Sequence, residues 1–186
     1  MHVIVQNLRG DDIGIIAPYA AQISLLTRLL NTNAAYRTRF DETLGSYRAM
    51  QLSNIEIKTV DGFEGREKEV IIFSTVRNNT GGYIGFLADR RRLNVGLTRA
   101  KRGLFVVGSI STLKAGKMSQ RKNGEGQIIA KVGKGAEAWR RYAEFLNQEK
   151  MVIQLSGERL TKLLYGKMPR TPTRAYSRIV QMESYY

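Results

Sequence analysis

Residues 70–76 read Val70-Ile71-Ile72-Phe73-Ser74-Thr75-Val76, a mostly apolar run that is rich in β-branched side chains. A strand that faces water on one side alternates polar and apolar residues, whereas a parallel strand covered on both faces is apolar at successive positions. Residues 70–76 therefore predict a buried central strand, the first element of an α/β fold.

Further strands and helices alternate along the chain on either side of this run. The other expected strands are 13–17, 55–60 and 103–108, and the last of these is again apolar enough to be buried on both faces. The expected helices are 20–31, 89–100, 136–150 and a shorter one over 158–165. Residues 32–54 carry no clear pattern. Strands that alternate with helices predict a layered parallel sheet with right-handed crossovers.

Composition excludes several kinds of chemistry. The 186 residues include no cysteine, which excludes a disulfide framework, a zinc-finger cluster and a thiol nucleophile. The single histidine is His2, so histidine-based catalysis and metal binding are not expected, and we predict no metal site. No apolar stretch approaches the roughly 18 residues that a membrane span needs. The sequence thus predicts one soluble intracellular domain with a tail.

The charge balance points to a polyanionic partner. The chain has 30 Lys and Arg against 16 Asp and Glu, a formal net charge of +14. Such a surface attracts nucleic acid above all, and an anionic membrane surface is the weaker alternative. The stretch 115–134 concentrates lysines among glycines and is expected to be a mobile basic loop. It is either an extra nucleic-acid contact or a solvated insertion.

Two segments carry residue types that suit a phosphate ligand. Residues 61–67 read Asp61-Gly62-Phe63-Glu64-Gly65-Arg66-Glu67, where glycines let the backbone approach a ligand; a solvated turn with a surface ion pair is the alternative. Arg99 suits an arginine finger, because a guanidinium matches phosphate oxygens and stays charged. Gly96, one turn earlier, is expected to leave room for a ligand or a facing domain. The alternative is a cationic helix face in water. In an α/β sheet such sites are expected at the carboxyl ends of the strands.

The sequence lacks the other half of an ATP site. No glycine loop ends in Gly-Lys-Ser or Gly-Lys-Thr, and Asp41-Glu42 follows Arg39-Phe40 where a magnesium-binding pair would follow an apolar strand. The chain by itself is therefore expected not to hydrolyse ATP.

Three blocks together resemble successive motifs of superfamily 1B helicases, in the branch that contains the nonsense-mediated-decay RNA helicase and senataxin. The blocks are Ile13-Gly14-Ile15-Ile16-Ala17-Pro18-Tyr19-Ala20-Ala21-Gln22, Val60-Asp61-Gly62-Phe63-Glu64-Gly65-Arg66-Glu67-Lys68-Glu69-Val70-Ile71-Ile72 and Arg91-Arg92-Leu93-Asn94-Val95-Gly96-Leu97-Thr98-Arg99-Ala100-Lys101. The likeness runs from about residue 13 to about residue 165.

The resemblance implies the second RecA-like domain of a helicase, with a parallel sheet flanked by helices. It implies an ATP site shared with a first RecA-like domain that holds the Mg²⁺ ligands, with Arg99 as the catalytic finger. The implied nucleotide-binding residues are Gly65, Arg66, Glu67 and Arg92. The implied contacts to single-stranded RNA or DNA are Pro18, Tyr19 and Gln22.

The sequence also departs from this family. Gly62 and Glu64 stand where the family commonly has Ala and Gln, and Gly96 stands where it commonly has Ala. The chain is expected to begin partway through the second domain, with 1–165 a partial domain and 166–186 a disordered basic tail. It is expected in the nucleus or the cytoplasm. The alternative to a motor half is a helicase remnant that binds nucleic acid without catalysis.

Overall fold

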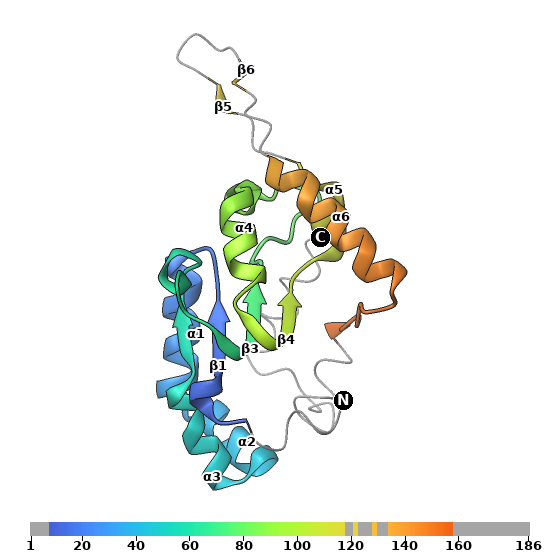
Figure 1. Cartoon of the computed structure of the whole chain (residues 1–186). Coiled ribbons are helices and arrows are strands. Elements are labelled where there is room, and N and C mark those ends of the chain that lie inside the picture. The colour runs from blue at the N-terminus through green and yellow to red at the C-terminus, as the bar shows by residue number, and fades with distance from the viewer. Residues whose placement is uncertain (1–7, 118–120, 123–127, 130–133, 158–186) are drawn as a thin grey trace. The chain divides into compact units, whose positions relative to one another are not determined.

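A computed structural model describes residues 8–117, 121–122, 128–129 and 134–157, and the chain divides into two compact units, 1–141 and 142–186. The first unit is built on a four-stranded parallel sheet in the order β2-β1-β3-β4 (Figure 1). The strands are β1 (Ile13–Ile16), β2 (Glu56–Lys58), β3 (Lys68–Ser74) and β4 (Ala100–Val107). The predicted α/β class with a parallel sheet flanked by helices is confirmed.

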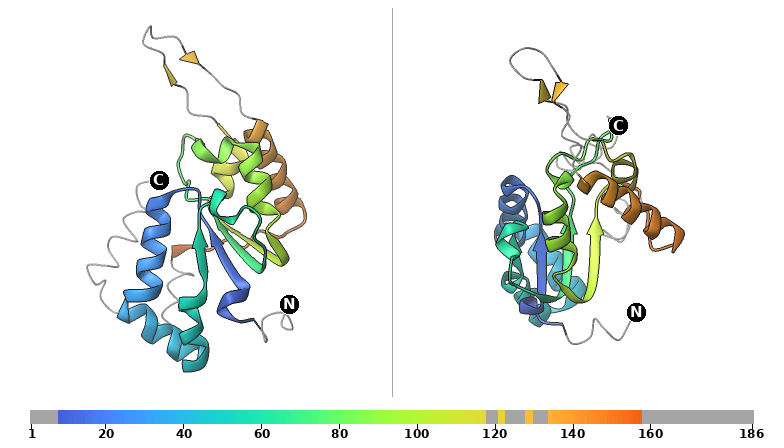
Figure 2. Two further views of the ribbon diagram at one scale, coloured as in Figure 1. Left: turned by 60° about the vertical axis from the view of Figure 1, so that its left-hand side comes forward. Right: turned by 45° about the horizontal axis from the view of Figure 1, so that its top comes forward.

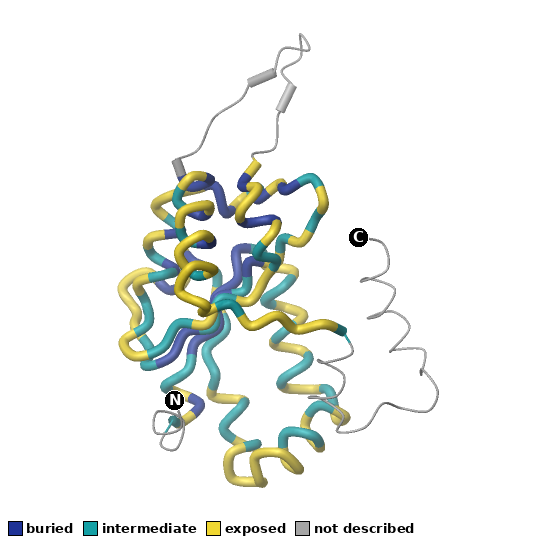
Figure 3. Tube along the Cα trace, turned by 90° about the vertical axis from the view of Figure 1, so that its right-hand side faces the viewer, coloured by how far each residue is buried: buried dark blue, intermediate teal, exposed yellow. Residues whose placement is uncertain are grey.

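The two strands predicted to be buried on both faces differ. β3 lies between β1 and β4, and its Ile71 and Phe73 are buried, as predicted. β4 lies at the edge of the sheet, with Phe105 48% and Val107 57% exposed, so the prediction of a second central strand is wrong. Figure 3 shows the buried residues gathered on the inner strands and on the segments packed against them.

The helices follow local signals at their ends. They are α1 (Ala20–Thr32), α2 (Ala34–Leu44), α3 (Ser46–Met50), α4 (Arg90–Leu97), α5 (Ile110–Ala115) and α6 (Lys134–Gln148). Asn33 begins α2 by accepting a hydrogen bond from the Tyr36 N–H, and Gly45 ends it at φ +80°. Asp89 begins α4 in the same way as Asn33, with the Arg91 N–H as donor. Figure 2 shows α1 to α3 on the side of the sheet where β2 lies, and α4 next to β3.

The connection from β2 to β3 carries no α-helix and runs over the sheet. Its short 3-10 turn, Asp61–Phe63, places the Phe63 ring over β1, where Phe63 is fully buried. A Cβ at Gly14 would lie 2.7 Å from the Phe63 ring, so glycine is needed at this crossing. The connection therefore leaves the carboxyl end of β2 and arrives at the amino end of β3. We call residues 59–67 the crossover.

Helix α4 likewise connects the carboxyl end of β3 to the amino end of β4. It packs on the sheet through Gly96. A Cβ at Gly96 would lie 2.3 Å from Phe73 Cε2. The expectation that Gly96 leaves room for a ligand or a facing domain is therefore wrong, because the missing side chain makes room for Phe73. The Phe73 ring also lies 5.8 Å from the ring of Trp139, whose Nε1 donates a hydrogen bond to the Leu87 carbonyl oxygen at 2.9 Å.

Other predicted segments lie partly or wholly outside the described residues. Within the basic stretch 115–134, the short strands β5 (Arg121–Lys122) and β6 (Ile128–Ile129) pair antiparallel. The predicted helix over 158–165 and the predicted tail 166–186 lie outside the described residues. None of the helices in the described ranges is both long enough and apolar enough to cross a bilayer.

Candidate functional site

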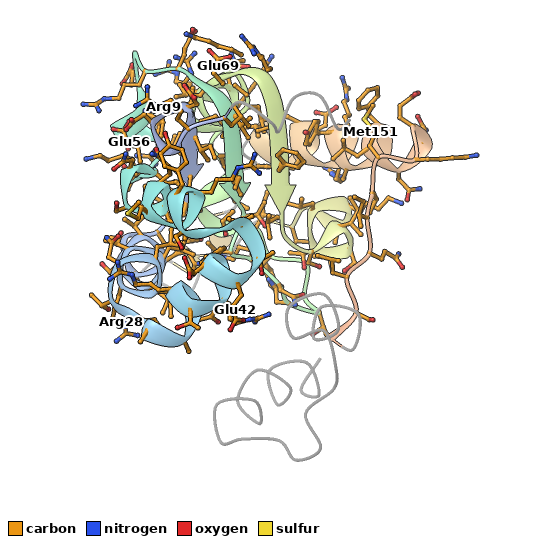
Figure 4. All side chains as sticks on the ribbon, turned by 90° about the horizontal axis from the view of Figure 1, so that it is seen from below. Arg9, Arg28, Glu42, Glu56, Glu69 and Met151 are labelled. Atoms are coloured by element: carbon orange, nitrogen blue, oxygen red, sulfur yellow. The ribbon has the colours of Figure 1, made fainter. Side chains whose placement is uncertain are left out.

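The amino ends of the strands, which we call the amino edge of the sheet, bring together three of the predicted nucleotide-binding residues and the predicted finger Arg99. Gly65, Arg66 and Glu67 directly precede β3, and Arg99 directly precedes β4. These strands are neighbours, and the Lys68 N–H donates to the Arg99 carbonyl oxygen at 3.0 Å. Figure 4 views this edge, with Glu56 and Glu69 labelled. The sequence predicted these residues at the carboxyl ends of the strands. That placement is wrong for these residues, because the crossover and α4 carry them to the opposite edge.

Gly65 presents an open stretch of backbone. Its φ is +72°, a left-handed conformation that favours glycine, and a Cβ placed on it would have no heavy atom within 4 Å. The turn is closed by the Arg66 N–H, which donates to the Phe63 carbonyl oxygen at 3.0 Å. Backbone conformation, and not crowding, accounts for a glycine at this position, and the exposed backbone is accessible to a ligand.

Arg66 ties this turn to the neighbouring strand. Its Nη1 donates to Glu56 Oε1 on β2, and Lys68 Nζ lies 3.3 Å from Glu56 Oε2. Lys68 Nζ also donates to the Asp11 carbonyl oxygen at 2.7 Å. Arg66 therefore braces the turn, while Glu67 beside it is exposed at the amino edge.

Arg99 lies against the end of α4. Its Nε donates to the Val95 carbonyl oxygen at 3.1 Å and its Nη2 to Thr98 Oγ1 at 3.0 Å. A cation at this position also interacts favourably with the carboxyl end of the helix. No carboxylate of the described residues lies within ion-pairing distance of Arg99, and its Nη1 makes no hydrogen bond with them. The guanidinium is oriented and half-buried, and its charge is unpaired among the described residues.

Arg92 lies at the opposite ends of the strands, the carboxyl edge of the sheet. Its Nε and Nη2 each donate to Asp61 at 3.0 Å, and these hydrogen bonds hold the pKa of the Asp61 carboxyl below its usual value. Asp89 is 3.8 Å away, and the guanidinium lies 4.1 Å from the centroid of the Phe86 ring. Seven positions along a helix correspond to roughly 10 Å of axial rise, so Arg92 does not join the group around Arg99. It links the start of the crossover to the start of α4.

The predicted nucleic-acid contacts lie at this same carboxyl edge. Pro18 and Tyr19 follow β1, and Gln22 stands in the first turn of α1. The Tyr19 hydroxyl accepts a hydrogen bond from Arg77 Nε at 2.7 Å, and the Tyr19 ring lies 6.0 Å from that of Phe86. The sequence did not predict a role in the site for Arg77 or for Phe86, and the stretch Ile84-Gly85-Phe86-Leu87 resembles only the family's spacer ahead of the arginines. The only signal was the place of Arg77, directly after the buried strand.

The described residues show no ready metal site. Nowhere in these ranges do three or more acidic or histidine side chains gather in a way that could hold an ion.

The chain is similar in sequence to a known protein family and to several known proteins. The family model described as "AAA domain" matches residues 1–111. The chain is 35% identical over 164 residues to the Saccharomyces cerevisiae protein ECM32, whose name describes an ATP-dependent RNA helicase, with 77% of the chain and 13% of that protein covered. It is 46% identical over 114 residues to the DNA polymerase alpha-associated DNA helicase A of the same yeast, with 59% of the chain and 14% of the relative covered.

A third relative is the Drosophila melanogaster regulator of nonsense transcripts 1 homolog. Identity is 43% over 107 residues, which cover 58% of the chain and 8% of that protein. The chain thus spans about one seventh or less of the length of these relatives.

Proposed function

The chain belongs to the AAA-domain family of superfamily 1 helicases, and on that premise we propose that it supplies the arginine-bearing side of an ATP site in a larger ATP-dependent helicase. The facing side would come from a first RecA-like domain. The observation that carries this proposal is the assembly of Gly65, Glu67 and Arg99 at the amino edge, where two neighbouring strands begin.

Each of these residues suits one part of a nucleotide. The open backbone at Gly65 allows close approach of a sugar or phosphate, and the exposed Glu67 carboxylate can accept hydrogen bonds from ribose hydroxyls. Arg99 can turn from the end of α4 toward a γ-phosphate, where a guanidinium stabilises the charge that develops during transfer. Arg66 keeps its role as a brace against Glu56.

The residues at the amino edge suit the phosphates of ATP but not its Mg²⁺. The amino edge offers an unpaired guanidinium for phosphate and no group of carboxylates for a cation in the part of the chain that the structure describes. We therefore assign the Mg²⁺ ligands and the phosphate loop to the facing domain. Mg²⁺ would there neutralise phosphate charge when ATP is bound.

Single-stranded nucleic acid would lie at the opposite, carboxyl edge, near Pro18, Tyr19 and Gln22. The crossover and α4 both extend from this edge to the amino edge, and the Asp61–Arg92 pair joins them. Under this proposal Arg92 is a brace between the two connections and does not touch the nucleotide. Closure of the ATP cleft would therefore move the residues next to the single-stranded nucleic acid, because these two connections link the amino edge to the carboxyl edge.

The test is an Arg99→Ala substitution in a protein that joins this chain to a first RecA-like domain with a phosphate loop. Loss of an arginine finger lowers kcat by about 10³ or more, so nucleic-acid-stimulated ATP hydrolysis should fall by that factor. Arg102→Ala is the matched control, because this substitution removes the same charge only three positions further along the chain. Arg102 pairs with Glu69 at the surface.

Two results would contradict the proposal. If the Arg99→Ala protein hydrolyses ATP at the rate of the Arg102→Ala protein, the finger assignment is wrong. If the unsubstituted protein binds nucleic acid but never hydrolyses ATP, the chain is a non-catalytic remnant.

A further inference from the structure

The carboxyl end of β3 holds two local costs in successive residues. Val76 has φ +65°, a left-handed conformation that a β-branched side chain adopts only under steric strain. Thr75 is fully buried, and its Oγ1 makes no hydrogen bond with the described residues. Strain and unsatisfied polar groups of this kind concentrate at binding and catalytic sites, where they orient a neighbouring group. The neighbouring group here is Arg77.

Arg77 is held in place by two residues, Tyr19 and Gly85. Its Nε donates to the Tyr19 hydroxyl at 2.7 Å, and its guanidinium carbon lies 5.0 Å from the centroid of the Tyr19 ring. Gly85 also lies close to it, because a Cβ at Gly85 would lie 2.7 Å from Arg77 Nη2. The guanidinium is therefore oriented by its Nε, while neither of its terminal Nη groups makes a hydrogen bond with the described residues.

The charge of Arg77 has no counterpart in the described part of the chain. Arg92 nearby is paired with Asp61 and Asp89, whereas no described carboxylate lies within 4.0 Å of the Arg77 guanidinium. A half-buried guanidinium that is oriented but uncompensated attracts an anion of matching geometry. Phosphate oxygens match the planar donor fork of arginine.

We propose that Arg77 binds a backbone phosphate of single-stranded nucleic acid at the carboxyl edge, with Tyr19 as its positioning residue. This inference rests on the proposed function, because it takes the strand to lie at that edge. It changes the role of Tyr19 from a direct contact to a support.

A nucleic-acid strand fits this place better than an acidic protein segment. Beside Tyr19, the Phe86 ring is 44% exposed, and its centroid lies 6.0 Å from that of Tyr19. An oriented arginine next to an exposed aromatic ring is the combination that binds a phosphate and stacks the adjacent base. An acidic peptide would use the arginine but gain nothing from stacking.

The experiment measures binding of a fluorescein-labelled single-stranded oligouridine to the 186-residue chain by anisotropy, over a series of salt concentrations. Arg77→Gln should raise the Kd about tenfold and reduce the slope of log K against log salt by about 0.7, the value for one phosphate contact to a single strand. Arg102→Gln, which removes the same charge at the other edge, should raise the Kd less than about twofold.

Two further variants separate charge from orientation. Arg77→Lys keeps the charge but not the fork, so the salt slope should return while the Kd recovers only in part. Tyr19→Phe keeps the ring and removes the hydroxyl that accepts from Arg77 Nε, so the Kd should rise severalfold at an unchanged salt slope. Both variants keep the net charge, and their thermal midpoints show whether the fold is intact.

Several outcomes would overturn the inference. If Arg77→Gln and Arg102→Gln weaken binding equally, Arg77 contributes only to the general field, and nucleic-acid binding itself still stands. If polyglutamate competes as well as unlabelled oligouridine at equal charge, the site takes any acidic polymer. If the unsubstituted chain binds no oligouridine, the nucleic-acid part of the proposed function fails as well, which the ATP hydrolysis test examines separately.

Discussion

A substitution of Gly96 tests the packing that carries α4, and with it Arg92 and Arg99, across the sheet. The added methyl group of Gly96→Ala would lie 2.3 Å from Phe73 Cε2 and 2.9 Å from Cδ2. Overpacking of this kind costs about 1–3 kcal/mol. Alanine in place of glycine inside a helix returns about 1 kcal/mol. The free energy of unfolding should therefore fall by about 1 kcal/mol, although alanine is the better helix former.

Phe73→Leu provides the complementary change. Alone, it should lower the free energy of unfolding by about 1–2 kcal/mol, because it leaves a cavity and loses the ring contact with Trp139. Leucine also lacks the ring atoms that the new methyl group would meet. The double variant should lose about 1 kcal/mol or less, well under the summed loss of about 2–3 kcal/mol, so that the two changes are coupled by about 1–2 kcal/mol.

The assay is urea denaturation followed by far-ultraviolet circular dichroism, with the m-value checked across the series. Gly103→Ala is the control, because a Cβ there would lie 3.6 Å from Val70 Cγ2, which is ordinary contact. It should be neutral or stabilising by up to about 1 kcal/mol, and additive with Phe73→Leu. If Gly96→Ala and Phe73→Leu add to within about 0.5 kcal/mol, α4 does not depend on this contact and the reasoning is refuted.

Two further predictions concern the crossover. Asp61 has a folded-state pKa below its unfolded value, so its pairing with Arg92 stabilises the fold above the unfolded pKa, near 3.8, and this contribution is lost as pH falls through the lower folded pKa. Asp61→Asn should therefore flatten the acid limb of stability against pH in urea titrations, and an unchanged limb would show that the pair does not form in solution. Gly65→Ala should cost about 1–2 kcal/mol, because φ is +72° while the space around a Cβ is open, and Gly65→Asn should cost less. Equal stability of the glycine and alanine forms in thermal unfolding would mean that the turn adopts another conformation.

The sequence predicts elements well where burial and local pattern coincide. β3 is apolar because it is central, and the run 70–76 identifies it directly. The run 103–108 in β4 is also apolar, but β4 lies at the edge of the sheet. The order of strands in a sheet cannot be read from the periodicity of the sequence. α2 contains no buried residue, so it lacks an apolar stripe and depends on its caps at Asn33 and Gly45. These caps are visible in the sequence, but on their own they do not indicate a helix.

The candidate site shows the same division. The motif resemblance grouped Gly65, Glu67 and Arg99, and the structure brings them to one edge. The edge itself could not be predicted, because the crossover spans the sheet without a helix to mark its path. Arg77 could not be predicted as a site residue, because its orientation comes from the backbone of Val76 and from a tyrosine distant in the sequence, neither of which is a local pattern.

The crossover and α4 link the two edges of the sheet, so a substitution at one edge should affect the position of residues at the other. At the carboxyl edge they are joined by the Asp61–Arg92 pair, and at the amino edge by the hydrogen bond from the Lys68 N–H to the Arg99 carbonyl oxygen. Between these ties, Phe63 and Gly96 pack each connection on the sheet. A segment fixed at both ends and along its length transmits displacement instead of absorbing it. Under the proposed function, a nucleic-acid strand that displaces Arg92 at the carboxyl edge would therefore also displace Arg99 at the amino edge.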